Sequence, residues 1–233
     1  MFITFEGIEG CGKSTQAKRL VNRLKKLGIP LVFTLEPGGT QIGRDIRRIL
    51  LDSQNKHISP LAELFLYEAD RAQHIKEVIQ PALQQDRWVV CDRFSDATVV
   101  YQGYARGQDI SLIAVLNKKA CLDIRPDFTF LLDCPVEVGL ERALKRTKLL
   151  KQDGQDRFER EEKNFHEAIR QGYLSMAGEN SKRFIVVDGT LKEDELEEVI
   201  FRYIRPPRKL SENGFIARSS ESFEGKGTRP KRP

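Results

Sequence analysis

The chain alternates short apolar runs with stretches of helical periodicity. The apolar runs have the length and composition of buried strands, and they cover residues 2–5, 31–35, 88–91, 128–132 and 184–187. The helical stretch after the first run places Ala17, Leu20, Val21, Leu24 and Leu27 on one face. Strands that alternate with amphipathic helices are typical of βαβ units. The pattern therefore predicts an α/β fold with a mainly parallel five-stranded sheet flanked by helices on both faces.

Acidic residues stand at or just beyond the end of each predicted strand: Glu6, Glu36, Asp92, Asp133 and Asp188. The carboxyl ends of parallel strands meet at one edge of a sheet, and ligands of open α/β sheets bind there. These residues are candidates for a ligand site, although an acidic residue at this point can also cap the following helix.

A glycine-rich segment joins the first predicted strand to the first predicted helix, and it reads Gly7-Ile8-Glu9-Gly10-Cys11-Gly12-Lys13-Ser14. This is the P-loop pattern G-x-x-x-x-G-K-[ST] in its required strand-to-helix context. Its backbone N–H groups can surround a polyphosphate, Lys13 can reach the β- and γ-phosphates, and Ser14 can join a Mg²⁺ shell. We predict ATP binding by Gly7, Ile8, Glu9, Gly10, Cys11, Gly12, Lys13, Ser14 and Thr15.

The residues after the third predicted strand favour a small-molecule kinase among P-loop proteins. A hydrolytic motor usually has Glu beside the strand-end Asp, but here Asp92 is followed by Arg93. The segment 117–120 lacks the final Asp of the guanine-reading N-K-x-D motif. The Asp92 carboxylate can share a Mg²⁺ site with Ser14, and the Arg93 guanidinium can bind an acceptor phosphate.

A lid is predicted at about 147–158, where a Lys-, Gln-, Asp- and Gly-rich segment interrupts two helical patterns. A cationic lid would exclude water and neutralise charge on the transferring phosphoryl group. Arg142 and Arg146 share a helix face, and Arg157 follows the loop. These three arginines are catalytic candidates alongside Lys13, Asp92 and Arg93, and the choice among the three stays open.

Several ordered motifs resemble the thymidylate kinase family: the P-loop and the segments 36–40, 70–74, 92–94, 101–103 and 125–127. The resemblance covers roughly residues 1–205. It implies an enzyme in which ATP and Mg²⁺ phosphorylate dTMP to dTDP, in the synthesis of dTTP. It also implies a homodimer.

The resemblance carries roles onto matching positions. Glu9 matches an acid near the deoxyribose 3′-hydroxyl, Tyr67 the aromatic that stacks on thymine, and Arg71 the arginine that hydrogen-bonds the base. Arg93 matches the arginine that holds the acceptor phosphate. The full substrate-binding set implied is Glu9, Glu36, Tyr67, Arg71, Arg93, Thr98, Tyr101 and Gln102. No arginine follows Glu9 in the P-loop, which resembles the bacterial-type arrangement with a lid arginine, Arg146 first.

The net charge of +5 changes this picture little, because most of it lies at the end of the chain. Residues 206–233 hold seven basic and three acidic side chains, so they contribute +4. This segment is rich in Pro, Gly and Ser, and we expect a disordered, solvated tail. Nucleic acid is therefore not an expected partner, although a nucleic-acid-dependent ATPase that uses the tail remains an alternative. Another nucleoside monophosphate kinase or a deoxynucleoside kinase is a second alternative.

The four cysteines are far apart and form no C-x-x-C pair, which excludes a disulfide framework and a zinc site of that type. They favour a reducing cytoplasm. No apolar run is long enough to span a bilayer, and we expect neither a signal peptide nor membrane association. The three histidines are scattered, and no chemistry is assigned to them.

Overall fold

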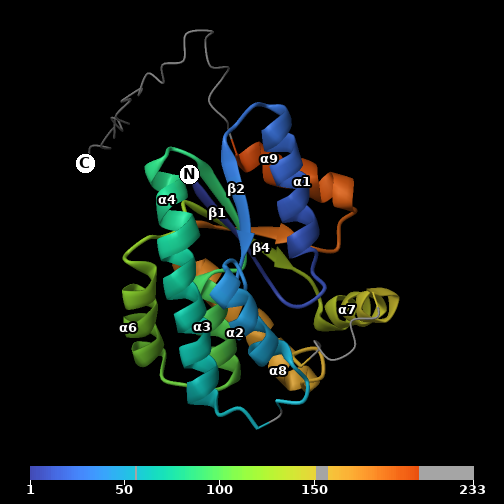
Figure 1. The fold of residues 1–233 in the computed structure, drawn as a ribbon. Helices are drawn as coiled ribbons and strands as arrows, with labels where there is room; N and C mark the ends of the chain where they lie inside the picture. Colours follow the sequence, from blue (N-terminus) through green and yellow to red (C-terminus); the bar gives the residue numbers. More distant parts are fainter. Residues whose placement is uncertain (56, 151–156, 205–233) are drawn as a thin grey trace, which may run out of the picture. The chain divides into compact units, whose positions relative to one another are not determined.

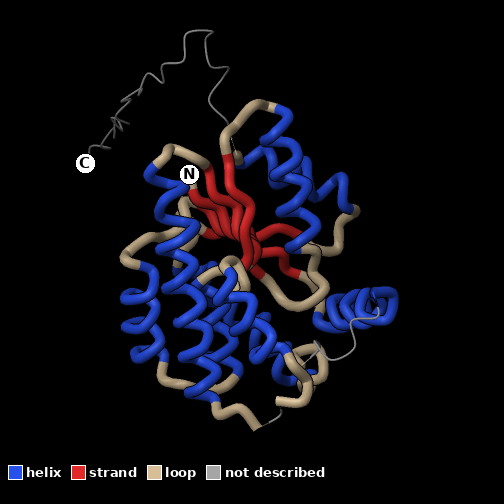
Figure 2. Tube along the Cα trace, in the orientation of Figure 1, coloured by secondary structure: helices blue, strands red, loops and turns tan. Residues whose placement is uncertain are grey.

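A parallel sheet of five strands lies at the centre of the structure, a computed structural model that describes residues 1–55, 57–150 and 157–204 (Figures 1 and 2). The strands run in the order β2-β3-β1-β4-β5. Their bounds are β1 (Phe2–Glu6), β2 (Leu31–Leu35), β3 (Trp88–Asp92), β4 (Phe128–Asp133) and β5 (Phe184–Asp188). All pairs of neighbouring strands are parallel, with Phe2 of β1 opposite Val89 of β3. The predicted sheet is confirmed.

Four of the five strands extend one residue further than their apolar runs, because the terminal acid still pairs with a neighbouring strand. Glu6 lies opposite Leu131, and Asp133 lies opposite Asp188. These carboxylates are therefore fixed at the carboxyl ends of the strands as the last paired residues. The exception is β2, which ends at Leu35, one residue before Glu36.

Helices cover both faces of the sheet, as predicted. In Figure 1, α1 and α9 lie on one side of the sheet and α3, α4 and α6 on the other. The elements are α1 (Lys13–Lys26), α2 (Gln41–Leu51), α3 (Pro60–His74), π-helical η1 (Ile75–Ile79), α4 (Gln80–Gln84), α5 (Ser95–Thr98), π-helical η2 (Val99–Ala105), α6 (Ile110–Cys121), α7 (Val136–Leu150), α8 (Lys163–Glu179) and α9 (Glu193–Tyr203).

Apolar side chains from each helical layer bury the sheet. The predicted inner face of α1 is buried through Leu24, and only Leu27, just past the helix, is exposed. On the other side, a core cluster joins Phe2 of β1 to Ile79 and Cys121. Burying one such large side chain stabilises the fold by about 1.5–3 kcal/mol. The two layers thus hold the carboxyl ends of the strands in a fixed arrangement.

The helical stretch expected from Leu61 to Leu83 is divided by η1. Pro81 has no N–H to donate, and its ring would clash with a carbonyl one turn earlier in a regular helix. The chain instead makes a wider turn, in which the N–H of Gln80 donates to the Ile75 carbonyl, five residues back. The chain direction continues through this turn into α4.

Helix α7 runs to Leu150, so its end lies within the predicted lid of 147–158. Residues 151–156 of that lid lie outside the described residues, and so does the predicted tail 206–233. The start of α7 packs tightly against the P-loop. Gly10 has φ 70°, and a Cβ there would lie 1.9 Å from the Gly139 carbonyl oxygen. Glycine is needed at this position to let the loop and the helix touch.

Among the described residues, none of the helices combines the length and apolarity that a membrane span requires. All four cysteines are buried free thiols.

Candidate active site

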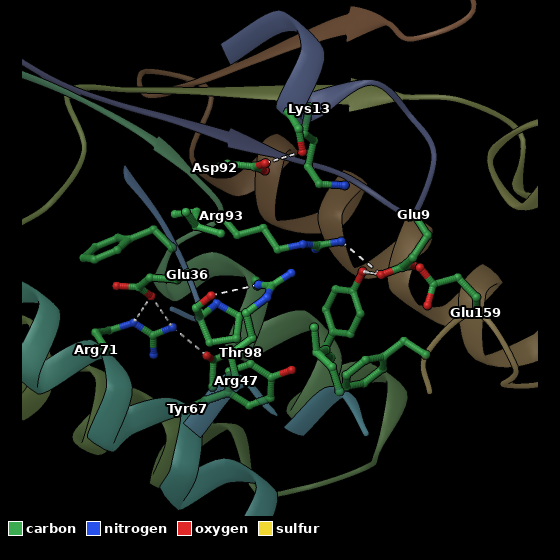
Figure 3. Close-up of a pocket in the computed structure, with 18 of the residues that line it drawn as sticks. Glu9, Lys13, Glu36, Arg47, Tyr67, Arg71, Asp92, Arg93, Thr98 and Glu159 are labelled. Atoms are coloured by element: carbon green, nitrogen blue, oxygen red, sulfur yellow. Dashed lines mark hydrogen bonds and ion pairs between the residues drawn. The ribbon is translucent and has the colours of Figure 1, made fainter. Parts of the chain in front are cut away.

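A cavity of about 500 Å³ opens at the carboxyl ends of the strands. Figure 3 shows its polar side chains, with Lys13 and Asp92 at one end, Tyr67 and Arg71 at the other, and Arg93 between them. The lining residues are Glu9, Gly10, Lys13, Ser14, Lys18, Leu35, Glu36, Pro37, Arg47, Leu51, Tyr67, Arg71, Asp92, Arg93, Phe94, Ala97, Thr98, Tyr101, Gln102, Arg146, Phe158 and Glu159.

The phosphate end of the cavity, which we define as the P-loop with Asp92 and Arg93, is shaped by backbone geometry. Gly12 has φ 100° and stands immediately before α1, so the helix begins at Lys13 with its N-terminal N–H groups at the loop. The Lys13 ammonium donates to the Ile8 carbonyl at 2.6 Å. Ser14 donates to an Asp92 carboxylate oxygen. A hydroxyl and a carboxylate, the hard oxygen donors that Mg²⁺ prefers, therefore lie beside the anion-binding end of α1.

Arg93 crosses the middle of the cavity. Its backbone is left-handed, with φ 70°, and its N–H donates to Phe5 of β1 at 3.0 Å. Such strain in a non-glycine residue persists where surrounding contacts hold it. Its guanidinium donates to Glu9 at 3.0 Å and to the Tyr173 hydroxyl at 3.3 Å. Tyr101, on η2, donates to the same Glu9 oxygen at 2.5 Å.

Glu9 is an ionised carboxylate despite its burial. Burial alone would raise its pKa, but His166, Arg93 and Lys13 together hold the pKa of Glu9 well below its usual range. A permanent negative charge thus faces the same cavity as the P-loop lysine.

Glu6 has the opposite balance, although it lies nearby at the end of β1. Burial and the neighbouring charge of Asp96 raise the pKa of Glu6 to about 8, against the weaker effect of Arg93. Its two oxygens accept from the Phe94 N–H and the Tyr173 hydroxyl, each at 2.7 Å. Glu6 thus supports Arg93 through Tyr173.

The base end of the cavity, which we define as Tyr67 and the buried network around Arg71, is made of side chains. Arg71 donates to Glu36 at 2.9 Å, to Glu68 at 3.0 Å, and to Thr98 at 2.9 Å. A further bond runs to Asn117 at 2.9 Å. Nη2 of Arg71 also lies 2.9 Å from the same Glu36 oxygen, so the five N–H groups of the guanidinium all face protein partners.

Glu36 lines the cavity, but both its oxygens have protein partners. One accepts from Arg71, and the other lies 2.8 Å from Nδ1 of His74. Gln102 is similarly bonded to Glu63 at 2.9 Å. In this structure Glu36 supports Arg71, and its contact with the substrate stays a prediction.

The structure brings all eight predicted substrate-binding residues to this one cavity. Of the predicted ATP-binding residues, Glu9, Gly10, Lys13 and Ser14 line it. Gly7, Ile8, Cys11, Gly12 and Thr15 lie in the same loop and first helical turn but do not line the cavity. The Cys11 side chain is only 1% exposed, so its thiol faces the protein interior.

The three arginine candidates of the lid separate in space. Arg146 lines the cavity and lies 3.5 Å from Glu159. Arg142 donates to the Gly189 carbonyl at 2.7 Å and does not line the cavity. Arg157 is buried, and it donates to the Leu50 carbonyl at 2.6 Å and to Glu63 at 2.5 Å. Arg142 and Arg157 therefore do not line the cavity, although the Gly189 that Arg142 contacts packs against the Cys11 carbonyl of the P-loop.

Sequence reasoning missed Arg47, Phe158 and Glu159, which also line the cavity. Arg47 lies on α2 and donates to the Pro37 carbonyl at 2.8 Å. Burial lowers the pKa of Arg47, against the charges of Tyr67 and Asp92. The available signal was that Arg47 lies one helical turn after Gly43, on the same face of α2. This signal is weak, because an arginine on an amphipathic helix usually faces solvent.

Comparison with known proteins agrees with this geometry. A family model described as thymidylate kinase matches residues 5–200. The chain belongs to the thymidylate kinase family. It is 54% identical over 189 residues to a thymidylate kinase of Geobacter sp. (strain M21), covering 81% of this chain and 84% of that protein. A thymidylate kinase of Geobacter sulfurreducens is 55% identical over 188 residues, covering 81% and 88%.

A solved structure has the same fold. The thymidylate kinase of Ehrlichia chaffeensis superposes with a TM-score of 0.70 at 32% identity, covering 88% of this chain and 98% of that one. The family match ends at residue 200, so it includes every residue of the cavity and leaves out the basic end of the chain.

Proposed function

We propose that this protein transfers the γ-phosphoryl group of ATP to dTMP, forming dTDP for the synthesis of dTTP. One observation carries the proposal: a single cavity connects the P-loop lysine to an aromatic and arginine base site, with Arg93 between them. Phosphoryl transfer needs two bound substrates in line and a neutralised charge rather than covalent catalysis. Membership of the thymidylate kinase family supports the choice of acceptor.

Lys13 and the N-terminus of α1 bind the ATP phosphates in this proposal. The ammonium is held by a neutral carbonyl, so its charge is free to meet the β- and γ-phosphate oxygens. Ser14 and Asp92 would hold Mg²⁺, together with phosphate oxygens and water. The ion would supply charge neutralisation on the triphosphate. The described residues include no cluster of three or more metal-ligating side chains, which fits a Mg²⁺ ion held mainly by the nucleotide.

Arg93 and Arg47 bind the acceptor phosphate. Both line the cavity between its two ends, and each guanidinium has more N–H groups than the hydrogen bonds described above use. Planar guanidinium groups match phosphate oxygens in pairs. They would hold the attacking oxygen toward the ATP side.

Tyr67 stacks on thymine, and Arg71, which lines the same cavity, shares one N–H of its guanidinium with a base oxygen. Tyr67 and Arg71 are one helical turn apart on α3, so both project from one face. Thr98 and Gln102 keep Arg71 and the wall of the base site in place, while Tyr101 and Glu9 lie toward the deoxyribose. Glu9 accepts a hydrogen bond from the 3′-hydroxyl of the sugar.

Arg146 is the lid arginine that acts on the transferring phosphoryl group. It is the one of the three candidates that lines the cavity, and its half-exposed guanidinium has Glu159 as a partner only at 3.5 Å. Docking of ATP would offer a stronger anionic partner at shorter range.

The enzyme acts as a homodimer in a reducing cytoplasm in this proposal. Helices α3 and α6 lie against one another and expose a group of apolar side chains: Leu61, Phe65, Ile110, Leu112 and Val115. Exposed apolar patches of this kind mark interaction surfaces. The four free, buried cysteines support the reducing compartment.

A coupled ADP-release assay with dTMP, dUMP, dCMP, AMP and GMP tests the proposal. We expect turnover with dTMP and Mg·ATP to exceed that with the other acceptors. Robust use of AMP or dCMP without activity on dTMP would contradict it. ATP hydrolysis stimulated by DNA would instead favour the alternative of a nucleic-acid-dependent ATPase.

A further inference from the structure

His166 lies at 0% exposure on α8, and neither ring nitrogen has a hydrogen-bond partner among the described residues. Buried imidazoles are almost always satisfied, so this one calls for an explanation. Its Nδ1 lies 3.4 Å from Oε2 of Glu9. That Glu9 oxygen is also buried without a hydrogen-bond partner in the described structure. Two unsatisfied atoms of complementary chemistry therefore face each other.

The other oxygen of Glu9 is already held. Oε1 accepts from the Tyr101 hydroxyl at 2.5 Å and from the Arg93 guanidinium at 3.0 Å. The carboxylate is thus fixed at one edge and meets His166 at the other. A donor at the second edge would set the plane of the carboxylate and so the direction in which Glu9 offers its charge to the cavity.

Neighbouring side chains on the buried face of helix α8 fix the position of His166. Tyr173, two turns further along, is also at 0% exposure and bonds both Glu6 and Arg93. Ile169 lies between them and is equally buried. Phe165 packs edge-on to the imidazole, with the two ring centroids 5.6 Å apart. The helix therefore presents two polar side chains to the acceptor site from behind.

We propose that His166 is a positioning residue, whose Nδ1–H donates to Oε2 of Glu9 and so orients the carboxylate toward the 3′-hydroxyl of the acceptor deoxyribose. The role of Glu9 toward that hydroxyl rests on the proposed function. The contact requires a proton on Nδ1, which one tautomer of the neutral imidazole carries and the imidazolium carries as well. The 3.4 Å separation shortens when the acceptor is bound, as hydrogen bonds of a site commonly do on substrate binding.

The contact itself is tested by nitrogen NMR on the substrate-free protein. We expect the ¹⁵N shifts of His166 to show a proton on Nδ1, and the Glu9→Gln substitution to move the Nδ1 resonance. The exposed His57 gives a reference signal for an imidazole without this contact. A bare Nδ1, or a resonance that Glu9→Gln leaves unchanged, overturns the proposal whatever the protein phosphorylates.

The role in catalysis is tested with three substitutions and two acceptors. His166→Asn keeps an N–H close to the place of Nδ1, His166→Gln places one near Nε2, and His166→Phe keeps only a planar ring. Each is assayed with dTMP and with 3′-deoxy-dTMP, which lacks the hydroxyl that Glu9 meets. Losing a hydrogen bond to a buried charge corresponds to roughly a tenfold loss of kcat/KM.

We expect His166→Phe and His166→Gln to lose roughly tenfold in kcat/KM on dTMP, and less than about twofold on 3′-deoxy-dTMP. His166→Asn restores most of the loss. Ile169→Val, a packing change on the same buried helix face, affects both acceptors equally. Equal losses on both acceptors in the His166 variants, or no loss on either, overturn the positioning role. A wild-type protein inactive on dTMP refutes the proposed function, and NMR still decides the contact.

Discussion

The two ends of the cavity are built in different ways. At the phosphate end, Lys13 is bonded to a backbone carbonyl, and the loop itself supplies N–H groups. At the base end, Arg71 donates four hydrogen bonds to protein side chains, and Glu36 and Gln102 are likewise bonded within the protein. At the phosphate end, the charge of Lys13 is therefore available to a ligand. At the base end, most polar groups are already hydrogen-bonded to other side chains.

The difference reflects what each end must recognise. A triphosphate brings charge and needs cations that are free to neutralise it, most of all as charge moves in the transition state. A base is neutral and planar, so it is recognised by shape and by one or two fixed hydrogen bonds. Side chains locked by neighbours hold that shape at low entropic cost on binding. We therefore expect substitutions at the phosphate end to lower kcat, and substitutions at the base end to raise KM for dTMP.

The largest effect is expected from Lys13→Ala. Because the ammonium neutralises charge in the transition state, its removal should lower kcat on the order of 10³-fold. Steady-state ADP release measures this, with Lys25→Ala, on the last turn of the same helix, as the control. A kcat close to wild type would mean that the Lys13 ammonium does not neutralise charge in the transition state.

Arg146→Ala should lower kcat by about 10²-fold and leave dTMP affinity nearly unchanged, because its guanidinium docks on the transferring group. Arg157→Ala is the matched contrast. It removes a buried partner of Glu63, so it should destabilise the fold by roughly 2–4 kcal/mol in urea unfolding. Arg142→Ala should alter neither kcat nor KM strongly. Loss of kcat in Arg157→Ala without a loss of stability would reverse this assignment.

Tyr67→Ala should raise KM for dTMP roughly tenfold while KM for ATP stays within about twofold, since base stacking is worth ~1–3 kcal/mol. Tyr67→Phe keeps the ring and should behave like the wild type. Initial rates over a matrix of both substrates give the two constants. A parallel rise of both KM values would place Tyr67 in the core rather than in the base site.

Glu6, behind Arg93, is expected to affect stability and its pH dependence rather than turnover. Its pKa is raised by burial and by Asp96 from 4.5 to about 8, so its contribution to stability is complete below about pH 4.5 and is lost as the pH rises through 8. Between pH 5 and pH 8, the wild type should therefore lose about 3–4 kcal/mol of unfolding free energy relative to Glu6→Gln. Urea unfolding of both proteins at the two pH values measures this. If the unfolding free energies of the two proteins changed equally with pH, Glu6 would not be a protonated support behind Arg93.

Local pattern was sufficient for the elements and for the phosphate end. Strand length, helical periodicity and the P-loop spacing all follow from short-range geometry, so β1 could be located within one residue, and the loop and the buried face of the helix after it could be identified. Tyr67 and Arg71 could be paired for the same reason, because they lie one turn apart on a helix. The division of the helix by η1 was not foreseen, although Pro81 was a visible signal for it.

Packing between distant segments decided the rest. The same residue type, arginine, ends in three different environments at 142, 146 and 157, and nothing in the neighbouring residues distinguishes them. Arg47 lines the cavity because of the way α2 packs. His166, far from Glu9 in the sequence, lies beside it because α8 packs behind the P-loop. A one-dimensional pattern specifies which face of a helix is apolar, but the atoms that meet across two docked faces are set by the three-dimensional fit of the side chains.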